Sequence, residues 1–260
     1  MNDYAARAMK TLMSTLFISD IHLSDQRLGK LSLFERLLLG PARSADALYI
    51  LGDLFELWLG DDDRTRPHPQ VLALIRGVRS SGVPVFFMRG NRDVLVGRRF
   101  ADMTGSALLT DPTVIDLYGE QTLLMHGDTL CTKDIGYQRF RRLAHHPWVQ
   151  KAFLSLPFCL RARIGKGLRA NSMATTLMKP PEIVDVDETA VLQALNTHGV
   201  RRLIHGHTHR PGVHALMCAA GPALRTVLPD WYDGDGVLVC DPDGRQRLLR
   251  VEDYLAECER

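Results

Sequence analysis

The sequence has little of what marks several common classes of protein. No charge-free apolar run reaches the ~18 residues that a membrane-spanning helix needs, and the N-terminus lacks the apolar core of a signal peptide. The five cysteines are scattered, odd in number and outside any Cys-x-x-Cys pattern, which argues against a disulfide framework and a thiolate zinc site. Internal repeats and low-complexity tracts are also missing. These absences favour a cytoplasmic globular protein with reduced thiols.

What is present fits one globular domain. The chain has 260 residues, of which 45% are hydrophobic and 24% charged, so it can bury a large core. Its formal net charge of +2 gives no reason to expect bulk nucleic-acid binding. We expect residues 13–260 to form a single domain. Residues 1–12 are expected to be a disordered extension, and the natural protein could instead start at Met13.

Candidate ligands follow a series of apolar runs, each at the point where the run ends. The runs cover 16–18, 48–51, 85–88, 123–125 and 203–204. A lone His-x-His pair such as His207 and His209 is more often structural than metal-binding. Five such ends in one chain reverse that expectation, because open α/β sheets place ligands beyond the carboxyl ends of their strands. The candidate ligands are Asp20, His22, Asp53, Asn91, His126, His207 and His209.

The hydrophobic pattern predicts alternating strands and helices with a helical insertion. Apolar runs predict strands near 14–19, 47–51, 85–88, 114–117, 122–125, 201–205, 224–228, 236–240 and 246–251. Helical spacing predicts helices near 31–38, 70–79, 95–103 and 187–198. From Asp134 to about Pro181 the pattern is helical and basic, and Pro147 and Pro157 divide it into short pieces. We expect two packed sheets with helices outside them.

The candidate ligands offer oxygen and imidazole donors and no thiolate. This mixture suits Mn²⁺, Fe²⁺ or Zn²⁺ better than a structural zinc site. Seven ligands exceed what one ion with four to six ligands needs. We therefore expect two divalent ions about 3.5–4 Å apart, bridged by one carboxylate, that clamp a phosphoryl group and acidify a water.

Five short blocks, in this order, resemble those of the calcineurin-like metallophosphoesterases. They are Asp-x-His at 20–22, Gly-Asp-x-x-Glu at 52–56, Gly-Asn-x-Asp at 90–93, His-Gly at 126–127 and Gly-His-x-His at 206–209. The resemblance implies a four-layer α/β/β/α sandwich of two mixed sheets, with manganese as the expected metal. It implies one ion held by Asp20, His22 and His209, another held by Asn91, His126 and His207, and a bridge from Asp53.

The third block departs from the family at Arg92, where the family usually has His close to the scissile bond. Arginine cannot deliver a proton because its pKa exceeds ~12, but it can bind two phosphate oxygens. An alkoxide leaving group benefits from a general acid, whereas a phosphate monoester has a second pKa near ~6 and needs none. Arg92 therefore favours a phosphoanhydride substrate, and a surface arginine after a turn is the plain alternative. The resemblance makes Asn91, Arg92 and His207 the catalytic group.

A closer likeness is to family members that hydrolyse the diphosphate of lipid-linked nucleotide sugars. It extends over about 13–251 and includes blocks at 126–132, 169–172 and 205–211. It implies attack by a metal-activated water at the phosphorus next to the nucleoside. Thr176 departs from the Asn that these members carry at its position. The implied substrate contacts are Asn91, Arg92, Asp134, Tyr137, Arg169, Ser172, Thr176, Lys179 and His207.

The insertion at 134–181 is expected to form a lid over the metals that holds acyl chains. Large apolar and basic side chains are combined there, and we expect its arginines to face the diphosphate and a membrane surface. A solvated basic helical face is the plain alternative. The likeness implies a peripheral protein on the cytoplasmic face of the inner membrane of a Gram-negative bacterium. We expect no nucleic-acid partner and no obligate protein partner.

Three other functions compete with this one. A scaffold that only binds partners would have lost several ligands, and all seven are present. A nuclease or a protein phosphatase would be expected to keep His at the position of Arg92. A soluble nucleotide-sugar or dinucleoside polyphosphate pyrophosphatase shares the metal core and the anhydride chemistry. It differs only in the lid and around Ser172, so it is the alternative function.

The remaining polar and aromatic residues are expected to have structural or surface positions. We expect Glu56 and Asp128 to support the metal ligands from behind. The run Asp61–Asp63 is most simply a solvated loop, with a position at the rim of the metal site as the alternative. Trp58 and Trp231 are expected to pack in the core. The histidines expected at the surface are His68, His145, His146, His198 and His214.

Overall fold

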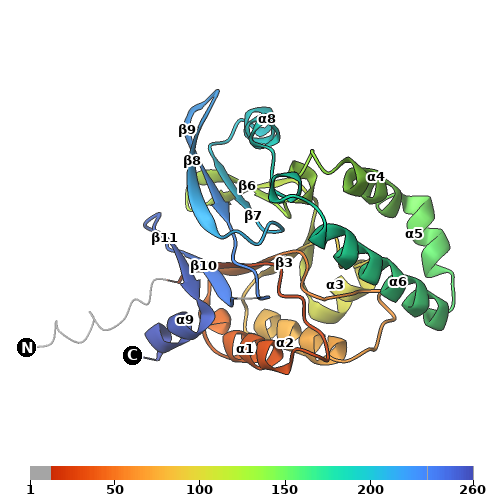
Figure 1. The fold of residues 1–260 in the computed structure, drawn as a ribbon. Coiled ribbons are helices and arrows are strands. Elements are labelled where there is room, and N and C mark those ends of the chain that lie inside the picture. Colours follow the sequence, from red (N-terminus) through yellow and green to blue (C-terminus); the bar gives the residue numbers. More distant parts are fainter. Residues whose placement is uncertain (1–12, 233, 260) are drawn as a thin grey trace, which may run out of the picture.

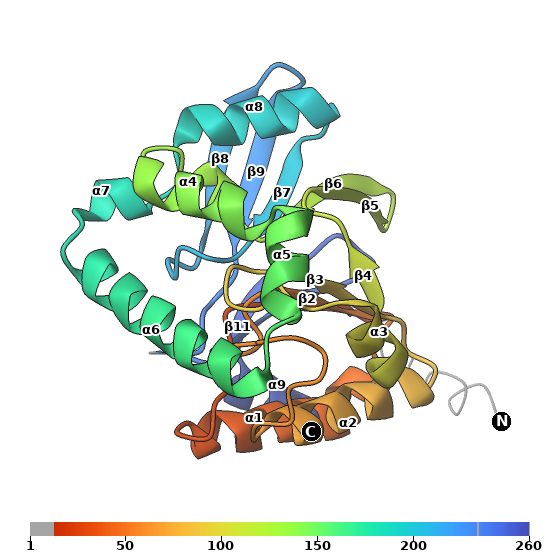
Figure 2. The same cartoon turned by 90° about the vertical axis from the view of Figure 1, so that its right-hand side faces the viewer.

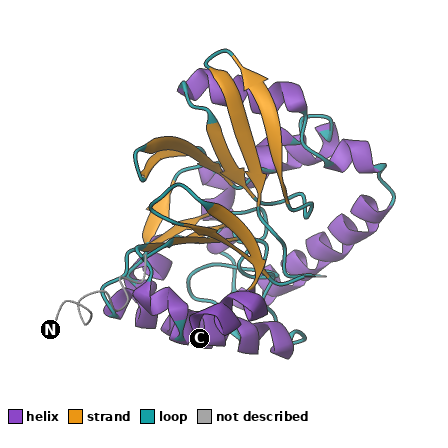
Figure 3. Ribbon diagram, turned by 90° about the vertical axis from the view of Figure 1, so that its left-hand side faces the viewer, coloured by secondary structure: helices purple, strands orange, loops and turns teal. Residues whose placement is uncertain are grey.

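Two mixed sheets face each other in the computed structural model, which describes residues 13–232 and 234–259 without the side chains of Thr176, Leu177 and Pro181. The extension predicted at 1–12 lies outside the described residues. Strand order is β11-β10-β1-β2-β3-β4 in the first sheet and β5-β6-β7-β9-β8 in the second. Helices cover the outer face of each sheet (Figures 1 and 3), which confirms the predicted four-layer α/β/β/α architecture.

The first sheet has a parallel centre. β1, β2, β3 and β4 run parallel, while β10 and β11 add antiparallel strands at one edge. Because both faces of the central strands are covered, they are apolar almost throughout. The strands are β1 (Thr15–Ile18), β2 (Ala47–Leu51), β3 (Val85–Met88), β4 (Ala107–Leu109), β10 (Gly236–Cys240) and β11 (Gln246–Arg250).

Four helices pack on the outer face of this sheet. Their apolar faces bury Phe34, Val71, Phe100 and Leu255 in one cluster with the strands. Burial of such side chains contributes about 1.5–3 kcal/mol each. The helices are α1 (Leu28–Leu39), α2 (His68–Ser80), α3 (Arg98–Thr104) and α9 (Val251–Cys258).

The second sheet carries one covering helix, α8 (Glu188–His198). Asp187 caps the start of α8 by accepting a hydrogen bond from the Thr189 backbone N–H, and Gly199, with a φ of 65°, ends it as predicted. Val191 and Leu195 on α8 are buried against the sheet. The strands are β5 (Thr113–Leu117), β6 (Glu120–Met125), β7 (Arg202–His205), β8 (Gly212–Cys218) and β9 (Gly221–Val227).

Helices occupy the predicted insertion and arch away from the sheets (Figure 2). Pro147 stands at the first position of α5, and Pro157 directly precedes α6, as expected for a residue that cannot continue a helix. The helices are α4 (Ile135–Ala144), α5 (Pro147–Leu154), α6 (Phe158–Leu177) and α7 (Pro181–Val184).

Ion pairs fasten the insertion to segments that follow the strands, which corrects two expectations. Arg161 on α6 is only 3% exposed, and its guanidinium binds the carboxylate of Asp62 and the carbonyl of Leu59. Arg141 on α4 binds Asp128 at 2.6 Å. These two arginines therefore face the protein interior instead of a membrane.

The run at 61–63 is consequently a folded loop and not simply a solvated one. Asp61 accepts hydrogen bonds from the Trp58 indole and from the backbone of Gly97 and Phe100. Asp63 is buried. It accepts a hydrogen bond from the backbone of Thr65.

Some elements and one histidine differ from the predictions. Strands β4 and β8 and helix α9 were not predicted. The last predicted strand ends at Arg250, and α9 begins at Val251. His68 was expected at the surface but is 4% exposed. Its ring lies 4.6 Å from that of Phe55 and its Nδ1 lies 3.5 Å from Asp63. The predicted packing of Trp58 and Trp231 is confirmed, since both are buried.

Candidate metal centre

Backbone hydrogen bonds extend the pairing of β1 and β2 into the loops that follow them. The N–H of Asp20 donates to Gly52 at 3.1 Å, and that of His22 donates to Asp53 at 3.0 Å. These loops therefore keep a fixed register beyond the strands. Three predicted ligands from two strand ends are brought together in this way.

A second set of bonds brings the other sheet to the same place. Gly206 N–H donates to the His126 carbonyl at 2.9 Å, which joins the ends of β6 and β7. The N–H of His207 donates to Asp20 Oδ2 at 2.8 Å, although the two residues lie 187 positions apart. The carboxyl ends of both sheets thus meet at one site.

The backbone at this site is strained. Left-handed φ values are uncommon for residues other than glycine and cost of order 1 kcal/mol or more each. Such residues persist where the surrounding structure holds them, and they cluster at functional sites. Five of the seven predicted ligands have them: Asp20 (53°), His22 (52°), Asp53 (54°), His207 (69°) and His209 (54°).

At two positions next to the site, only glycine fits, because any side chain would clash with a buried carboxylate. A Cβ on Gly90 would lie 2.2 Å from Asp53 Oδ1, and a Cβ on Gly206 would lie 2.2 Å from Asp20 Oδ2. Both distances are far inside van der Waals contact, and each involves a buried carboxylate. The two glycines are therefore required for the carboxylates to sit where they do.

Replacing Gly206 by Ala is expected to displace Asp20 and lower metal affinity by roughly 10–100-fold, the range seen when the support of a metal ligand is lost. Metal titration of the purified variant measures this. Gly167→Ala is the matched control, because a Cβ there meets nothing within 4 Å, and it should leave metal affinity unchanged. Equal affinity in the Gly206 variant and the wild type would contradict the steric argument.

The first group of donor atoms contains Asp20, His22 and His209. One atom from each lies within 4.8 Å of the others, and His209 Nε2 is 3.5 Å from Asp20 Oδ1. Among the described residues, Asp20 Oδ1 and both ring nitrogens of His22 are buried without a hydrogen-bond partner. Buried polar atoms of this kind are rare unless a water, ion or ligand satisfies them. The group therefore fits a cation.

The second group contains Asp20, Asp53 and His126, again within 4.8 Å. His126 Nδ1 donates to the Leu51 carbonyl at 2.9 Å, which turns the lone pair of Nε2 toward the group. Nε2 lies 3.1 Å from Asn91 Oδ1 and 3.7 Å from Asp53 Oδ1. The other oxygen of Asp53 is 3.8 Å from His22 Nε2, so this carboxylate lies between the two groups.

The electrostatics of the site also suit cations. Burial raises the pKa of Asp53 to about 7 against the opposing charge of His126. Burial alone would lower the pKa of His126, but the carboxylates of Asp53 and Asp20 raise it to about 9. Burial lowers the pKa of His207 to about 3 and that of His22 well below its usual value. Crowded carboxylates and neutral imidazoles with free lone pairs are what divalent ions bind.

A family model for calcineurin-like phosphoesterases matches residues 13–211. The chain belongs to this family. Two relatives named UDP-2,3-diacylglucosamine hydrolase are similar over nearly their whole length. The one from Escherichia fergusonii is 51% identical over 232 residues, covering 89% of this chain and 97% of its own. The one from Klebsiella pneumoniae is 50% identical over 231 residues, covering 89% and 96%.

Calcineurin-like phosphoesterases use divalent metals, and the donor groups described above fit them. His207 lies beside the second group, with its ring 5.1 Å from that of His126. Asn91 lies beside the same group, because its Oδ1 is 3.1 Å from His126 Nε2. The structure therefore brings all seven predicted ligand positions into one site of this phosphoesterase.

Carboxylates behind the ligands hold the loops in place. Asp93 accepts hydrogen bonds from the backbone of Leu54 at 2.8 Å and of Gly90 at 2.7 Å. Asp128 accepts from the Tyr137 hydroxyl at 2.5 Å and from Arg141 at 2.6 Å. These contacts support loops and the insertion.

Two residues near the first group were not predicted. The Tyr232 ring lies 4.6 Å from that of His22, and its hydroxyl donates to Glu56 Oε2 at 2.6 Å. Asp230 Oδ1 lies 3.9 Å from His209 Nδ1. Both follow β9, which runs parallel to β7, so the rule that ligands follow strand ends could have found Asp230.

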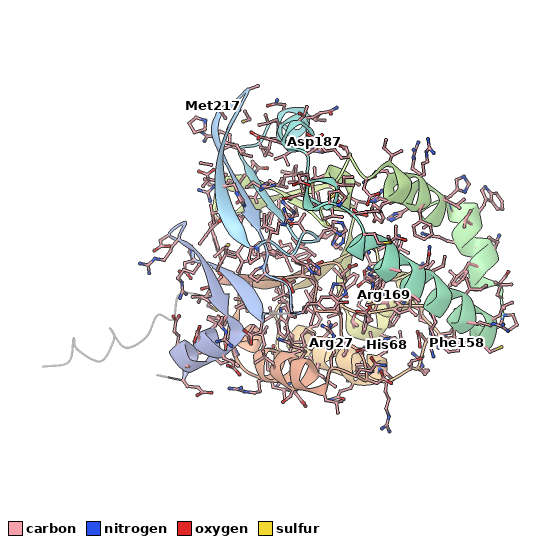
Figure 4. The ribbon with its side chains drawn as sticks, viewed as in Figure 1. Arg27, His68, Phe158, Arg169, Asp187 and Met217 are labelled. Carbon is pink, nitrogen blue, oxygen red and sulfur yellow. The ribbon has the colours of Figure 1, made fainter. Side chains whose placement is uncertain are left out.

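Several predicted substrate contacts pair with one another or with the sheets. Arg169 on α6 (Figure 4) binds the carboxylate of Glu56, and its Nη2 donates to the Tyr232 hydroxyl at 2.7 Å. Lys179 Nζ lies 2.6 Å from Asp134 Oδ2.

Two further predicted contacts lie near these pairs. The Tyr137 ring is 6.0 Å from that of His207, and Ser172 is half-buried. The side chain of Thr176 lies outside the described residues. The insertion thus brings predicted substrate contacts to the edge of the metal centre.

Proposed function

We propose that this phosphoesterase hydrolyses the diphosphate of UDP-2,3-diacylglucosamine to UMP and 2,3-diacylglucosamine 1-phosphate, a step of lipid A biosynthesis. The observation that carries the proposal is identity of about 51% to a hydrolase of that name, over 97% of its length. The donor groups at the strand ends support it, because they fit the metals of the family.

The metal set is proposed from the site geometry and the family likeness. Two divalent ions, with manganese proposed, supply positive charge for the phosphate oxygens and acidify a water when bound. The proposed ligands are Asp20, His22 and His209 for one ion, Asn91, His126 and His207 for the other, and Asp53 for both.

Arg92 is proposed to bind the diphosphate together with Asn91 and His207. Its backbone N–H donates to Asp53 Oδ1 at 2.8 Å, which ties it to the donor groups. Its Nε is buried and has no hydrogen-bond partner among the described residues. The guanidinium therefore has an N–H group that can donate to a phosphate oxygen. The leaving group is a phosphate monoester that needs no proton, so a fixed positive charge at Arg92 is sufficient.

The insertion at 134–181 is proposed to be a lid of the single domain 13–260 that holds the acyl chains. On α6, Arg161 and Gly165 are buried against the loop that follows β2, and Leu168 follows at the spacing of the same helix face. Leu168 is nevertheless 48% exposed, and Phe140 on α4 is 45% exposed. An acyl chain would cover such side chains, at ~0.8 kcal/mol per buried methylene.

The outer side of the lid is proposed to meet an anionic membrane from the cytoplasm. Residues 135–181 contain nine Lys and Arg and no Asp or Glu. Four of the nine pair with carboxylates, and the other five are exposed. Trp148 is 72% exposed with Lys151 Nζ 5.6 Å from its ring centre. No described helix is long and apolar enough to cross a membrane, and the proposed contact is peripheral.

Removing the acyl chains from the substrate is expected to lower kcat/KM at least ~100-fold, because the methylene contacts under the lid are lost. Comparing UDP-2,3-diacylglucosamine with the de-acylated UDP-glucosamine under the same conditions measures this. A variant lacking 138–165 should lose the difference between the two substrates. Equal efficiency in the wild type would favour the soluble pyrophosphatase alternative.

Replacing Arg139 and Arg142 by Ala together is expected to weaken binding to phosphatidylglycerol vesicles roughly 10–30-fold, since each basic residue near an anionic surface contributes ~1 kcal/mol. Vesicle co-sedimentation measures the change. Arg98 and Arg99, exposed on α3, provide the matched double control. If the control loses as much binding as the lid variant, the lid does not face the membrane.

Product analysis tests the proposed function itself. The manganese-loaded protein should convert UDP-2,3-diacylglucosamine to UMP and the lipid phosphate, and a chelator should stop the reaction. UDP-glucose and dinucleoside polyphosphates should be poor substrates. Preferential cleavage of either soluble compound would replace the proposal with the soluble pyrophosphatase.

A further inference from the structure

A pocket of about 490 Å³ has Tyr232 in its lining, and the Tyr232 ring also lies against His22 at the metal centre. It is formed where the start of α1 meets the segment after β9. Its volume falls in the ~300–1,000 Å³ range of small-molecule sites. Its polar lining residues are Gln26, Arg27, Lys30, Tyr232, Asp235 and Glu252.

Tyr232 is the wall that the pocket shares with the metal centre. Its ring lies 4.6 Å from that of His22 and 5.5 Å from that of His209. Its hydroxyl binds Glu56 and Arg169, which fix the ring in place. A ligand in the pocket would therefore contact the same tyrosine that borders the first group of donor atoms.

Arg27 brings a positive charge to this wall. Its guanidinium carbon lies 3.7 Å from the centre of the Tyr232 ring. Among the described residues, no carboxylate lies within ion-pair distance of Arg27. The stacked geometry fixes the guanidinium while leaving its N–H donors available, which is the arrangement that recognises phosphate and also stacks on bases.

The rest of the lining matches a nucleoside. The Gln26 amide offers both a donor and an acceptor for a base edge. Asp235 and Glu252 offer carboxylate oxygens of the kind that accept hydrogen bonds from ribose hydroxyls. Arg250 donates from Nε to Asp235 Oδ1 at 3.2 Å and from Nη2 to Glu252 Oε2 at 3.4 Å. These bonds fix the position of both carboxylates.

The position of the pocket divides the substrate into two halves. Arg169 reaches the Tyr232 hydroxyl from α6 in the lid, whereas Arg27 lies over the ring face and comes from the loop before α1 (Figure 4). The substrate contacts proposed above lie in the lid and at the metal centre, and none of them lies in this pocket. A diphosphate at the metals would therefore direct its lipid half under the lid and its other half past Tyr232.

We propose that the pocket lined by Gln26, Arg27 and Tyr232 binds the nucleoside monophosphate half of the substrate, and the UMP product after cleavage. This inference rests on the proposed function, because it takes UMP as one of the two products. It assigns Arg27 to the nucleotide side and leaves the lipid phosphate to the lid.

Isothermal titration of UMP into the manganese-loaded protein tests the pocket without turnover. Arg27→Ala should weaken UMP binding at least ten-fold, and Gln26→Ala should weaken UMP more than inorganic phosphate. Binding of 2,3-diacylglucosamine 1-phosphate should stay within two-fold of the wild type in both variants. Arg98→Ala on α3 is the control, and thermal unfolding checks that each variant is folded.

Three outcomes overturn the assignment: no UMP binding to the wild type, unchanged UMP binding in both variants, or an equal loss of UMP and lipid phosphate binding. Failure of the proposed function would look different. In that case UMP would still bind through Arg27 and Gln26, while UDP-2,3-diacylglucosamine would not be cleaved.

Discussion

Replacing Asp53 by Ala is expected to lower kcat at least ~10³-fold while the protein remains folded. The carboxylate lies between the two donor groups, 3.7 Å from His126 Nε2 and 3.8 Å from His22 Nε2. The fold should persist, because burial already disfavours the charged form of Asp53 and raises its pKa to about 7.

Metal analysis by mass spectrometry shows whether the loss has the expected cause. The wild type should hold two ions per chain and the Asp53 variant fewer. Asp25→Ala, an exposed carboxylate in the loop after β1, is the matched control and should retain both ions and full activity. One ion per chain in a fully active wild type would contradict the dinuclear site.

Replacing Arg92 by Ala is expected to lower kcat/KM by about 10²–10³-fold, the range for removing one charged group that stabilises a transition state. Arg92→Lys should retain more activity than Arg92→Ala, because it keeps the charge, but less than the wild type, because a single ammonium cannot bind two oxygens. Steady-state kinetics of the three proteins at one pH measure this order.

The pH profile separates charge from proton transfer at this position. Because arginine stays protonated, the Lys variant should keep the shape of the wild-type profile near neutral pH. Arg99→Ala, exposed on α3, is the control for removal of a surface arginine. Equal kcat for Arg92→Ala and the wild type at saturating substrate would exclude a catalytic role.

The arrangement of the site was largely predictable because strand ends are readable in the sequence. Apolar runs mark the buried strands, and the polar residue after each run must lie at the carboxyl edge of its sheet. This rule places Asp53 and His126 at the site, although the sequence does not show the contacts between them. The left-handed φ values and the space above Gly90 could not be read, since they depend on how the two sheets meet.

The missed elements have a common physical cause. Strand β8 is an edge strand with mostly exposed side chains, and β4 has three residues, so neither gives a strong apolar period. Helix α9 follows β11 without a turn signal. His68 and Asp63 form a buried pair with Phe55, and pairing of this kind across a loop leaves no local signature.

Tyr232 illustrates the same limit at the site. It stands in a loop after β9, and its importance comes from contacts with several separate segments. These contacts are with Arg27, His22, His209, Glu56 and Arg169. No spacing rule predicts such a meeting point.

The most direct test of the proposed chemistry is hydrolysis of UDP-2,3-diacylglucosamine in ¹⁸O-labelled water by the manganese-loaded protein. Attack at the phosphorus next to the nucleoside places one ¹⁸O in UMP and none in 2,3-diacylglucosamine 1-phosphate, which mass spectrometry of the two products distinguishes. The label is therefore predicted in UMP. Label in the lipid phosphate instead, or no cleavage of this substrate, would contradict the account.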